Sequence, residues 1–514
     1  MKYPIGIQTF SELRTGNWVY VDKTMHIYRM VTEGKCYFLS RPRRFGKSLL
    51  ISTLEAYFRG QKSLFEGLAI ADLEQEWKEY PVLHFDLNAK PFTNLEDLYE
   101  LLNDQLSFYE QEYASIAVDK SPEGRFRQLI RSAKHKTGEN VVVLIDEYDK
   151  PILQAIGNEV LQDEFRNTLK AFYGVLKSAD ADLRFTLLTG VTKFGKISVF
   201  SDLNNLNDIT MDTRYSCLCG ITEEELYTTF EESVAELAQI NHQTKEEAYG
   251  ELKRRYDGYH FAHNGQGIYN PFSLLNTFQK STYANYWFAT GTPTYLVELL
   301  KKSTFCLPDL SNYQTSLSML DTIHSGNINP VPVLFQSGYL TIKGFDSRFK
   351  LYTLDYPNEE VKQGFIDFLL PYYTQLKDKQ SQTIVSQFVL SLESGDVDRF
   401  MQLLQSLLAD TPYELIRELE NHYQNVIYII TKLMGFYVQA EYRTSRGRID
   451  LLIGTDKYIY IVELKFDGSA AQALEQIKSK DYSLPFASGS REVIKIGANI
   501  SSETRNIAQW LTER

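Results

Sequence analysis

The sequence predicts an α/β protein of several domains, and three observations lead to this fold class. The chain has 514 residues, which is more than one ordinary hydrophobic core holds. Short apolar segments alternate with amphipathic ones through the first 190 residues, which favours a parallel sheet with helices on both faces. From about residue 386 the order differs, because helical segments come first and strands follow. We therefore expect an N-terminal parallel-sheet domain, a helical middle and a smaller C-terminal α/β domain.

The N-terminal strands are expected at residues 36–40, 81–87, 141–146 and 184–190, with helical stretches such as 48–60 and 94–113 between them. A helical, acidic region follows to about residue 300, and the next part is mixed, with strand-like segments at 331–342 and 348–354. Helices at 386–395, 397–410 and 414–435 then lead to strands, a helix ending at Tyr482 and a strand. The expected domains are 1–215, a lid-like helical region 216–300, a mixed connecting region 301–385, and 386–514.

Composition and charge exclude several classes of protein. Hydrophobic residues make up 43% and charged residues 23%, the balance of a soluble globular protein. No apolar run approaches the roughly 18 residues of a membrane helix. The N-terminus has no basic flank followed by an apolar stretch, so we do not expect secretion. The four cysteines form neither a disulfide framework nor a paired zinc pattern, so a cytoplasmic location is expected: Cys36, Cys217, Cys219 and Cys306.

The net charge of −12 argues against a protein that coats nucleic acid with its whole surface. The sum hides a local difference, because residues 436–514 carry eleven Lys and Arg against ten Asp and Glu. A local nucleic-acid site near the C-terminus is therefore allowed.

A phosphate-binding loop is indicated by "FLSRPRRFGKSLLIS" at residues 38–52, because it follows a strand and opens a helix. Gly46, Lys47 and Ser48 match the end of the pattern GxxxxGK[ST]. Lys47 is expected to reach the β- and γ-phosphates of a nucleotide and Ser48 to bind Mg²⁺. The helix N-terminus would add N–H donors and a positive dipole.

This loop departs from the pattern at its first glycine. Arg41 stands in that position, and Pro42 removes a backbone donor. We expect the loop to be shaped by Pro42 and helped in nucleotide binding by Arg43 and Arg44.

A second segment strengthens the nucleotide interpretation. "VVVLIDEYDKP" is an apolar strand that ends in Asp146 and Glu147, and such strands deliver acids to the carboxyl edge of a sheet. Asp146 would hold Mg²⁺ and Glu147 would polarise the attacking water. The next strand ends in Thr189-Gly190, with Thr189 placed to sense the γ-phosphate. The alternative is a buried strand capped by surface acids.

These segments, with several others, resemble the AAA-ATPase-like proteins whose C-terminal part is similar to PD-(D/E)XK nucleases. The resemblance runs from about residue 3 to 485 and rests on "YVDKT", "SRPRRFGKSLL", "LIDEYDKPI", "TGVTKFGKISVFSDLNNLNDIT", "YDGYHF" and "YNPFSLLN". It implies a P-loop NTPase fold, ATP rather than a guanine nucleotide, and a C-terminal restriction-endonuclease-like domain. It also implies that Arg41-Pro42 is the usual loop of this family. Asp22 and Lys23 are candidates near the nucleotide, with strand-edge charges as the alternative.

The hairpin "GRIDLLIGTDKYIYIVELKF" (447–466) carries the second set of candidates. If Asp456-Lys457 is a two-residue turn, Asp450 lies opposite Glu463, and Glu463 shares a face with Lys465. Facing positions have Cβ atoms about 4.5–5.5 Å apart, where two carboxylates repel unless a cation lies between them. Lys465 could activate water and stabilise charge at a phosphate. The alternative is a set of cross-strand ion pairs on a solvent-facing strand.

The family pattern extends to neighbouring residues. The order helix Glu, strand Asp, strand Glu-x-Lys, helix Gln matches Glu420, Asp450, Glu463, Lys465 and Gln476, with Glu420 as a third carboxylate for metal. Positive charge for phosphates would come from Arg443, Arg446 and Arg448. Three candidates remain. His422 is read as structural or as contacting substrate, and Glu441 as a strand-edge charge or as contacting metal or substrate. Tyr482 is read as packing the last helix on the sheet.

The sequence thus predicts an ATP-binding, ATP-hydrolysing protein whose C-terminal domain cleaves DNA or RNA with Mg²⁺ or Mn²⁺ under control of the ATPase. The rival hypothesis is a nucleotide-switched binding module for nucleic acid or protein, with a structural or inactive nuclease-like domain. A homo-oligomer or a protein partner stays open, and Arg214 is a candidate arginine finger. "YDGYHF" and "YNPFSLLN" have no assigned chemistry beyond a helix start at Asn270 and Pro271.

Overall fold

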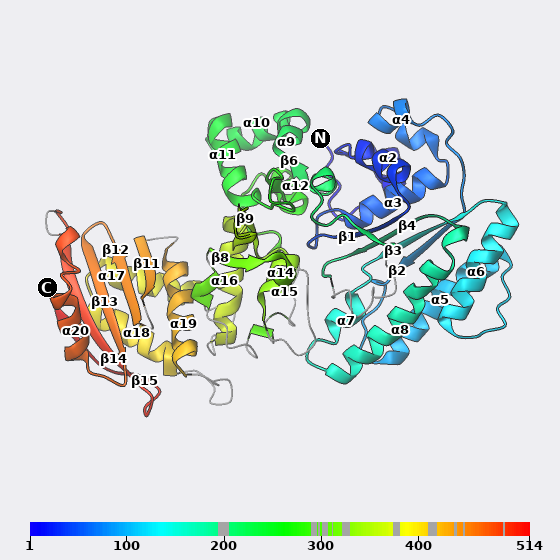
Figure 1. Cartoon of the computed structure of the whole chain (residues 1–514). Coiled ribbons are helices and arrows are strands. Elements are labelled where there is room, and N and C mark those ends of the chain that lie inside the picture. Colours follow the sequence, from blue (N-terminus) through cyan, green and yellow to red (C-terminus); the bar gives the residue numbers. More distant parts are fainter. Residues whose placement is uncertain are drawn as a thin grey trace. The chain divides into compact units, whose positions relative to one another are not determined.

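The computed structural model of the chain describes residues 1–193, 205–288, 296, 299–300, 307–310, 312–320, 329–373, 381–409, 419–435, 439–445, 448–486 and 489–514. The chain divides into two compact units, Met1–Leu299 with Asn312–Val361, and Leu300–Ser311 with Lys362–Arg514. The predicted fold class is confirmed: a parallel sheet with helices, a helical middle and a C-terminal mixed sheet (Figure 1). The boundaries of the four expected domains stay a prediction.

The first unit is built on a parallel sheet. Its described strands, in spatial order, are β2 (Val82–Asp86), β3 (Val141–Asp146), β4 (Leu183–Gly190), β1 (Cys36–Ser40) and β5 (Asn207–Asp208). The four predicted strands are confirmed to within one residue at each end, and β5 was not predicted. Since β4 lies between β1 and β3, it separates the strand before the phosphate loop from the strand that carries Asp146.

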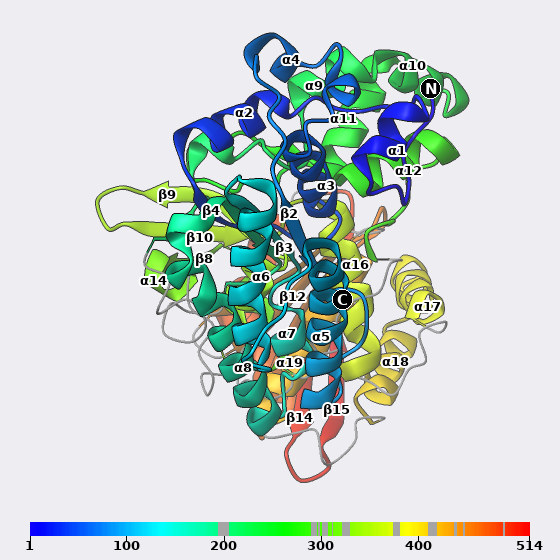
Figure 2. The ribbon, with the colours of Figure 1, turned by 90° about the vertical axis from the view of Figure 1, so that its right-hand side faces the viewer.

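Helices cover both faces of this sheet. On one face α5 (Leu95–Tyr113), α6 (Pro122–Thr137) and α8 (Glu159–Ser178) pack together, and they lie side by side in both views (Figures 1 and 2). Val141, Val143 and Ile145 of β3 join their core. The alternate residues Val142 and Leu144 are buried too, on the face where α3 contacts β2 and β3. The other described helices here are α1 (Phe10–Thr15), α2 (Thr24–Glu33), α3 (Lys47–Phe58), α4 (Ala69–Leu73) and α7 (Lys150–Gln154).

The helical middle has a core of its own. Its elements are β6 (Ile221–Thr222), α9 (Glu223–Thr229), α10 (Glu231–Ile240), α11 (Lys245–Tyr256), β7 (Ile268–Tyr269) and α12 (Pro271–Lys280). The helix starts are set by side chains: Thr222 and Thr244 form capping boxes with the glutamates three residues on. Asn270 accepts a hydrogen bond from the Ser273 N–H and Pro271 follows at the first turn, so the predicted helix start is confirmed.

The rest of the first unit holds a small antiparallel sheet. Its strands, in spatial order, are β8 (Tyr313–Ser316), β10 (Leu351–Asp355) and β9 (Thr341–Asp346), accompanied by α14 (Leu317–Leu320) and α15 (Val331–Gln336). The strand-like prediction for residues 331–342 is wrong in its first half, which forms α15. Pro332 lies in the first turn of that helix, where backbone N–H groups have no partner within the helix. The missing N–H of proline therefore does not disturb the start of a helix there.

The second unit places helices against a mixed sheet. α16 (Glu359–Tyr373) begins in the first unit and continues here, followed by α17 (Ser381–Glu393), α18 (Val397–Ala409) and α19 (Leu419–Met434). The strands run in chain order, β11 (Gln439–Ser445), β12 (Arg448–Gly454), β13 (Tyr458–Phe466), β14 (Glu492–Ser501) and β15 (Asn506–Glu513). β13 and β14 are parallel, and α20 (Ala470–Ser479) connects them. The expected final helix therefore ends at Ser479 rather than at Tyr482, and β15 was not predicted.

Gly497 on β14 lets α20 lie close to the sheet. A Cβ at this position would be 2.4 Å from the Ala470 carbonyl oxygen and 2.6 Å from the Leu474 N. Glycine is therefore required because a side chain would have no room between the sheet and α20, and not because of the backbone conformation. Across the part of the chain that the structure describes, we find no helix long and apolar enough to cross a bilayer.

Candidate functional site

The phosphate loop lies between β1 and α3. Gly46 caps α3 in the left-handed region with φ of 90°, which glycine adopts without strain. The helix begins at Lys47, so its first N–H groups follow directly on the loop. Ser48 is next, and its Oγ makes no hydrogen bond with the described part of the chain. The local geometry is that of an anion site at a helix N-terminus.

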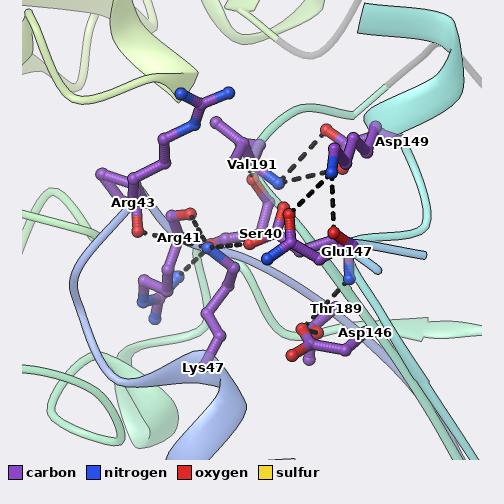
Figure 3. A network of polar contacts seen from close by, with 12 residues as sticks. Ser40, Arg41, Arg43, Lys47, Asp146, Glu147, Asp149, Thr189 and Val191 are labelled. Atoms are coloured by element: carbon purple, nitrogen blue, oxygen red, sulfur yellow. Dashed lines mark hydrogen bonds and ion pairs between the residues drawn. The ribbon is translucent and has the colours of Figure 1, made fainter. Parts of the chain in front are cut away.

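The ammonium group of Lys47 lies in the middle of a polar network (Figure 3). It donates to the carbonyl oxygens of Arg41 at 3.1 Å and Pro42 at 3.3 Å. It also forms an ion pair with Glu147 Oε1 at 3.2 Å, and the Lys47 side chain is only 4% exposed. The two residues expected to bind phosphate and polarise water therefore contact each other.

The acids lie at the carboxyl edge of the sheet, as predicted. Asp146 Oδ1 accepts hydrogen bonds from Thr189 Oγ1 at 2.6 Å and from the Glu147 N–H at 3.0 Å. Glu147 has φ of 53°, an uncommon conformation for a residue with a side chain, which is found often at functional sites. The structure thus brings Lys47, Asp146, Glu147 and Thr189 together.

Asp149 belongs to the same network and was not among the predicted residues. It is fully buried, and its carboxylate accepts hydrogen bonds from the Val191 N–H, the Thr192 N–H and the Thr192 hydroxyl. Burial, with a smaller contribution from Glu147, raises the pKa of Asp149 to about 6. It fixes the backbone that follows Thr189. A third acid so close to Asp146-Glu147, in "DEYDK", was the available signal.

The arginines of the loop divide into two kinds. Arg41 is fully buried and donates to the carbonyl oxygens of Ser40, Thr210 and Tyr215. Burial lowers the pKa of Arg41 to about 10. Arg43 and Arg44 are exposed, and the Arg43 side chain points away from Lys47 (Figure 3). Arg41 therefore shapes the loop, and nucleotide contact by Arg43 and Arg44 stays a prediction.

A largely apolar cavity of about 100 Å³ adjoins Gly46. Its walls include Tyr20, Val21, Phe45, Leu49, Leu50 and Ile221. A cavity with these walls, next to a phosphate loop, suits the flat apolar faces of a nucleobase.

The "YVDKT" residues support the fold around this cavity. Asp22 accepts hydrogen bonds from Thr24 and from the Ala69 N–H, and the Lys23 ammonium pairs with Glu225 at 2.6 Å. Lys23 also lines the cavity. Contact of either residue with nucleotide stays a prediction.

Arg214, the candidate arginine finger, is exposed and held within its own chain. Its guanidinium contacts Asp212 at 2.7 Å and Glu33 at 3.4 Å. The hydrogen bonds and charge of Asp212 raise the pKa of Arg214, so it is charged at every working pH.

In the second unit, the hairpin has the register that the sequence predicts. Thr455 and Tyr458 flank the two-residue turn, with the Thr455 N–H donating to the Tyr458 carbonyl at 2.9 Å. Counting outward, Asp450 pairs with Glu463 across β12 and β13. Directly paired positions place their Cβ atoms on the same face of the sheet.

Glu463 is a buried carboxylate with one free oxygen. It is 1% exposed, and its Oε1 accepts from the Lys465 ammonium at 3.3 Å. Its Oε2 is buried with no hydrogen-bond partner among the residues described. Lys465 in turn donates to Gln476 Oε1 on α20, so the helix holds the lysine beside the acid.

This arrangement fits a divalent cation. A buried carboxylate oxygen without a partner is costly, and an ion there would remove that cost. Asp450 is the residue opposite, and it would share the ion. The side chains of Asp450 and Glu420 lie outside the described part, so the predicted set of three carboxylates stays a prediction; the described side chains alone contain no cluster of three potential ligands.

Other predicted residues near the hairpin have structural surroundings. His422 is buried on α19 and stacks on Tyr373 at 5.9 Å, and burial lowers its pKa to about 4. Tyr482 packs against the apolar cluster of Ile459, Ile461 and Ile477, which supports its predicted packing role. Arg446 and Cys306 lie outside the described residues. The same holds for the side chains of Glu441, Arg443 and Arg448, which are in β11 and β12.

Comparison with known proteins adds two family matches and one relative. Residues 4–200 match a family described as predicted AAA-ATPase, and residues 418–510 match the PD-(D/E)XK nuclease superfamily. The chain is 36% identical over 526 residues to a protein of Azotobacter chroococcum mcd 1, described as an uncharacterized protein in the vnfD 5' region. The match covers 100% of this chain and 99% of that protein.

Proposed function

Because this chain belongs to the family of AAA-ATPase-like proteins with a C-terminal PD-(D/E)XK nuclease superfamily domain, we propose that it binds and hydrolyses ATP and cleaves DNA or RNA. The observation that carries the nuclease proposal is the buried, unpartnered Oε2 of Glu463, opposite Asp450 and beside Lys465. The ATPase proposal is supported by Lys47 and Glu147 meeting at the sheet edge next to an apolar cavity.

At the nucleotide site, the base would occupy the cavity beside Gly46, with the phosphates over the start of α3. Lys47 would leave Glu147 for the β- and γ-phosphates, because phosphate oxygens carry more negative charge than one carboxylate. Glu147, released, would accept a proton from the attacking water. Thr189, bound to Asp146, would report whether the γ-phosphate is present.

At the nuclease site, Lys465 would stabilise the negative charge that develops on the phosphate during cleavage. Gln476 keeps the Lys465 ammonium in reach of Glu463 and limits its rotation. Asp450, Glu463 and Glu420 would hold a divalent cation there, as Ser48 and Asp146 would beside ATP. When bound, Mg²⁺ or Mn²⁺ supplies charge neutralisation at the phosphate and activates water.

Control of cleavage by ATP is the third part of the proposal. α16 contains residues of both compact units, so a change at the nucleotide site has a continuous element through which to act. Cleavage would then depend on nucleotide state. The cytoplasm is the proposed location.

The test combines nucleotide binding and cleavage in one set of purified proteins. Wild type, Lys47→Ala and Glu463→Ala are incubated with single- and double-stranded DNA and RNA, with Mg²⁺ or Mn²⁺, with and without ATP. We expect Glu463→Ala to lose cleavage and keep ATP hydrolysis. Lys47→Ala is expected to lose ATP binding. Comparing its nucleic-acid cleavage with that of wild type, with and without ATP, shows whether nucleotide controls the nuclease.

Glu492→Ala serves as the matched control, because Glu492 pairs with the exposed Arg514 at the far end of the same sheet. If wild type binds ATP but cuts none of the substrates under any condition, the nuclease proposal fails. A nucleotide-switched module that binds nucleic acid or protein without cutting then becomes the better description.

A further inference from the structure

The segments "YDGYHF" and "YNPF", which have no assigned chemistry, lie against the phosphate loop. Tyr259 and Phe261 contact the Phe45 ring edge-on, with centroids 4.7 and 5.4 Å away. The Arg41 guanidinium lies over the Phe261 ring at 4.1 Å. The two aromatic rings therefore hold both ends of the RPRRF segment, residues 41–45.

The middle of the same segment is held as well. The Arg44 guanidinium lies over Phe272, in the first turn of α12, at 4.8 Å. Pro42 packs on Gly338, where a Cβ would approach the proline ring to 2.7 Å. We call Tyr259, Phe261, Phe272, Trp287 and Gly338 the clamp. All five belong to the first compact unit.

Among the clamp residues, Trp287 forms a hydrogen bond that fixes the direction of the peptide group between Arg43 and Arg44. Its indole N–H donates to the Arg43 carbonyl oxygen at 3.1 Å, and its side chain is buried against Tyr339. In a trans peptide the C=O and the following N–H point in opposite directions. Binding the Arg43 carbonyl on the clamp side therefore turns the Arg44 N–H away from the clamp. Arg44 has φ of 69°, so this orientation is held against a conformational preference.

Trp287 is itself positioned by Glu360. The Glu360 Oε1 accepts the Trp287 backbone N–H at 2.8 Å and the Ser273 hydroxyl at 2.9 Å. Glu360 is 1% exposed and lies at the start of α16. A buried carboxylate that accepts two hydrogen bonds ties α12, Trp287 and α16 to one point.

We propose that Trp287 is a positioning residue of the phosphate loop, which aims the Arg44 N–H at a phosphate of bound ATP, and that Glu360 positions Trp287. This inference rests on the proposed ATP site and adds two residues outside the motifs that mark it. In phosphate loops the backbone N–H groups bind the anion, and Pro42 supplies none. The orientation of the remaining N–H groups therefore matters more in this loop.

The test measures ATP binding by calorimetry, together with steady-state hydrolysis and thermal unfolding. Trp287→Phe keeps an aromatic ring and loses the indole N–H. We expect ATP Kd and KM to rise by about three- to tenfold, the range for one hydrogen bond, with kcat changed less than about twofold. Trp510→Phe is the matched control: it also removes an indole N–H bond, to Asp398, in the other unit. Its ATP Kd should equal that of wild type.

Glu360 supplies the second arm. Glu360→Gln keeps an oxygen for both hydrogen bonds and should bind ATP within about twofold of wild type. Glu360→Ala should weaken binding as Trp287→Phe does. The variant with both substitutions, Trp287→Phe and Glu360→Ala, tests whether Glu360 acts through Trp287. If it does, the two effects are not additive, and this variant should bind ATP with a Kd no higher than the higher of the two single-variant values.

The outcomes separate this inference from the proposed function. Wild type that fails to bind ATP overturns both. ATP binding by wild type with an unchanged Kd in Trp287→Phe overturns the role of Trp287 alone. Full additivity of Trp287→Phe and Glu360→Ala overturns the link between the two residues. A matching fall of the unfolding temperature in Trp287→Phe and Trp510→Phe, with a raised Kd in the former only, supports positioning over general destabilisation.

Discussion

Lys47 and Glu147 form the ion pair that bears most directly on the proposed ATP hydrolysis. The ammonium and carboxylate that the proposed ATP hydrolysis would use separately are paired at 3.2 Å. The pair lies where the sheet ends, in surroundings that screen it weakly. In the proposed mechanism, a phosphate that binds Lys47 would release Glu147, which could then accept a proton from the attacking water.

Glu147→Gln tests this at the residue scale. We expect hydrolysis to fall by about 10²- to 10⁴-fold, because the general base is lost. ATP affinity should stay equal or rise, since a neutral amide no longer competes with phosphate for the Lys47 ammonium. The measurements are phosphate release and calorimetric binding. Glu231→Gln, which alters the exposed pair with Lys245, is the control. Hydrolysis above about one tenth of wild type would contradict the proposed role.

Much of the nucleotide site could be predicted from residue order. Gly46-Lys47 after one strand and Asp146-Glu147 at the end of another meet because parallel strands end at one edge of a sheet. Trp287 and Glu360 could not be found in this way. They are far from the loop in the sequence, and a buried hydrogen bond to a main-chain oxygen leaves no pattern in either segment.

The hairpin shows what could be predicted at the scale of an element. A two-residue turn at Asp456-Lys457 sets the pairing along both strands, so Asp450 opposite Glu463 followed from counting. α15 was missed because it has six residues, five of them buried, and so short an apolar segment has no periodicity that separates a helix from a strand. Gly497 allows α20 to pack closely on β14. This contact is tertiary, so it cannot be predicted from the local sequence.

Gly497→Ala is the prediction at this scale. The added methyl group would press on the backbone of α20, which we expect to cost about 1–3 kcal/mol of unfolding free energy. Because α20 carries Gln476, which holds Lys465, nucleic-acid cleavage should fall more than ATP hydrolysis. Chemical unfolding and both activities are measured on the same samples.

Gly250→Ala is the matched control. Gly250 lies inside α11 with open space around its position, so alanine should stabilise the protein by about 0.5–1 kcal/mol. Equal unfolding free energies for Gly497→Ala and wild type would show that the sheet and α20 can move apart without cost.

At the scale of the whole molecule, charge limits how nucleic acid can bind. The chain carries a net charge of −12, while residues 436–514 are close to neutral. A broad basic surface is therefore not available, and phosphate contacts must be few and local. The two compact units each have their own core, which is consistent with separate sites for nucleotide and nucleic acid.

The salt dependence of nucleic-acid binding tests this limit. Fluorescence anisotropy with the Glu463→Ala variant avoids cleavage during the measurement. For duplex DNA we expect a slope of log K against log salt of about −2 to −4, corresponding to two to four phosphate contacts. Replacing Arg443 or Arg448 by alanine should each reduce the slope by about one if that side chain contacts a phosphate. A wild-type slope steeper than about −6 would reveal a basic surface that the charge count does not suggest.

The contacts of Arg41 limit which substitutions this loop can accept during evolution. Its guanidinium binds three main-chain carbonyls and lies over the Phe261 ring, so replacement by glycine would leave those oxygens without this partner and that ring uncovered. A single substitution to the glycine of GxxxxGK[ST] would therefore disturb the loop, because the segment holding Phe261 would have to change as well. We therefore expect residues 41–45 and the clamp residues to be kept or changed together in related proteins. More than two hundred residues separate the two sets in the chain.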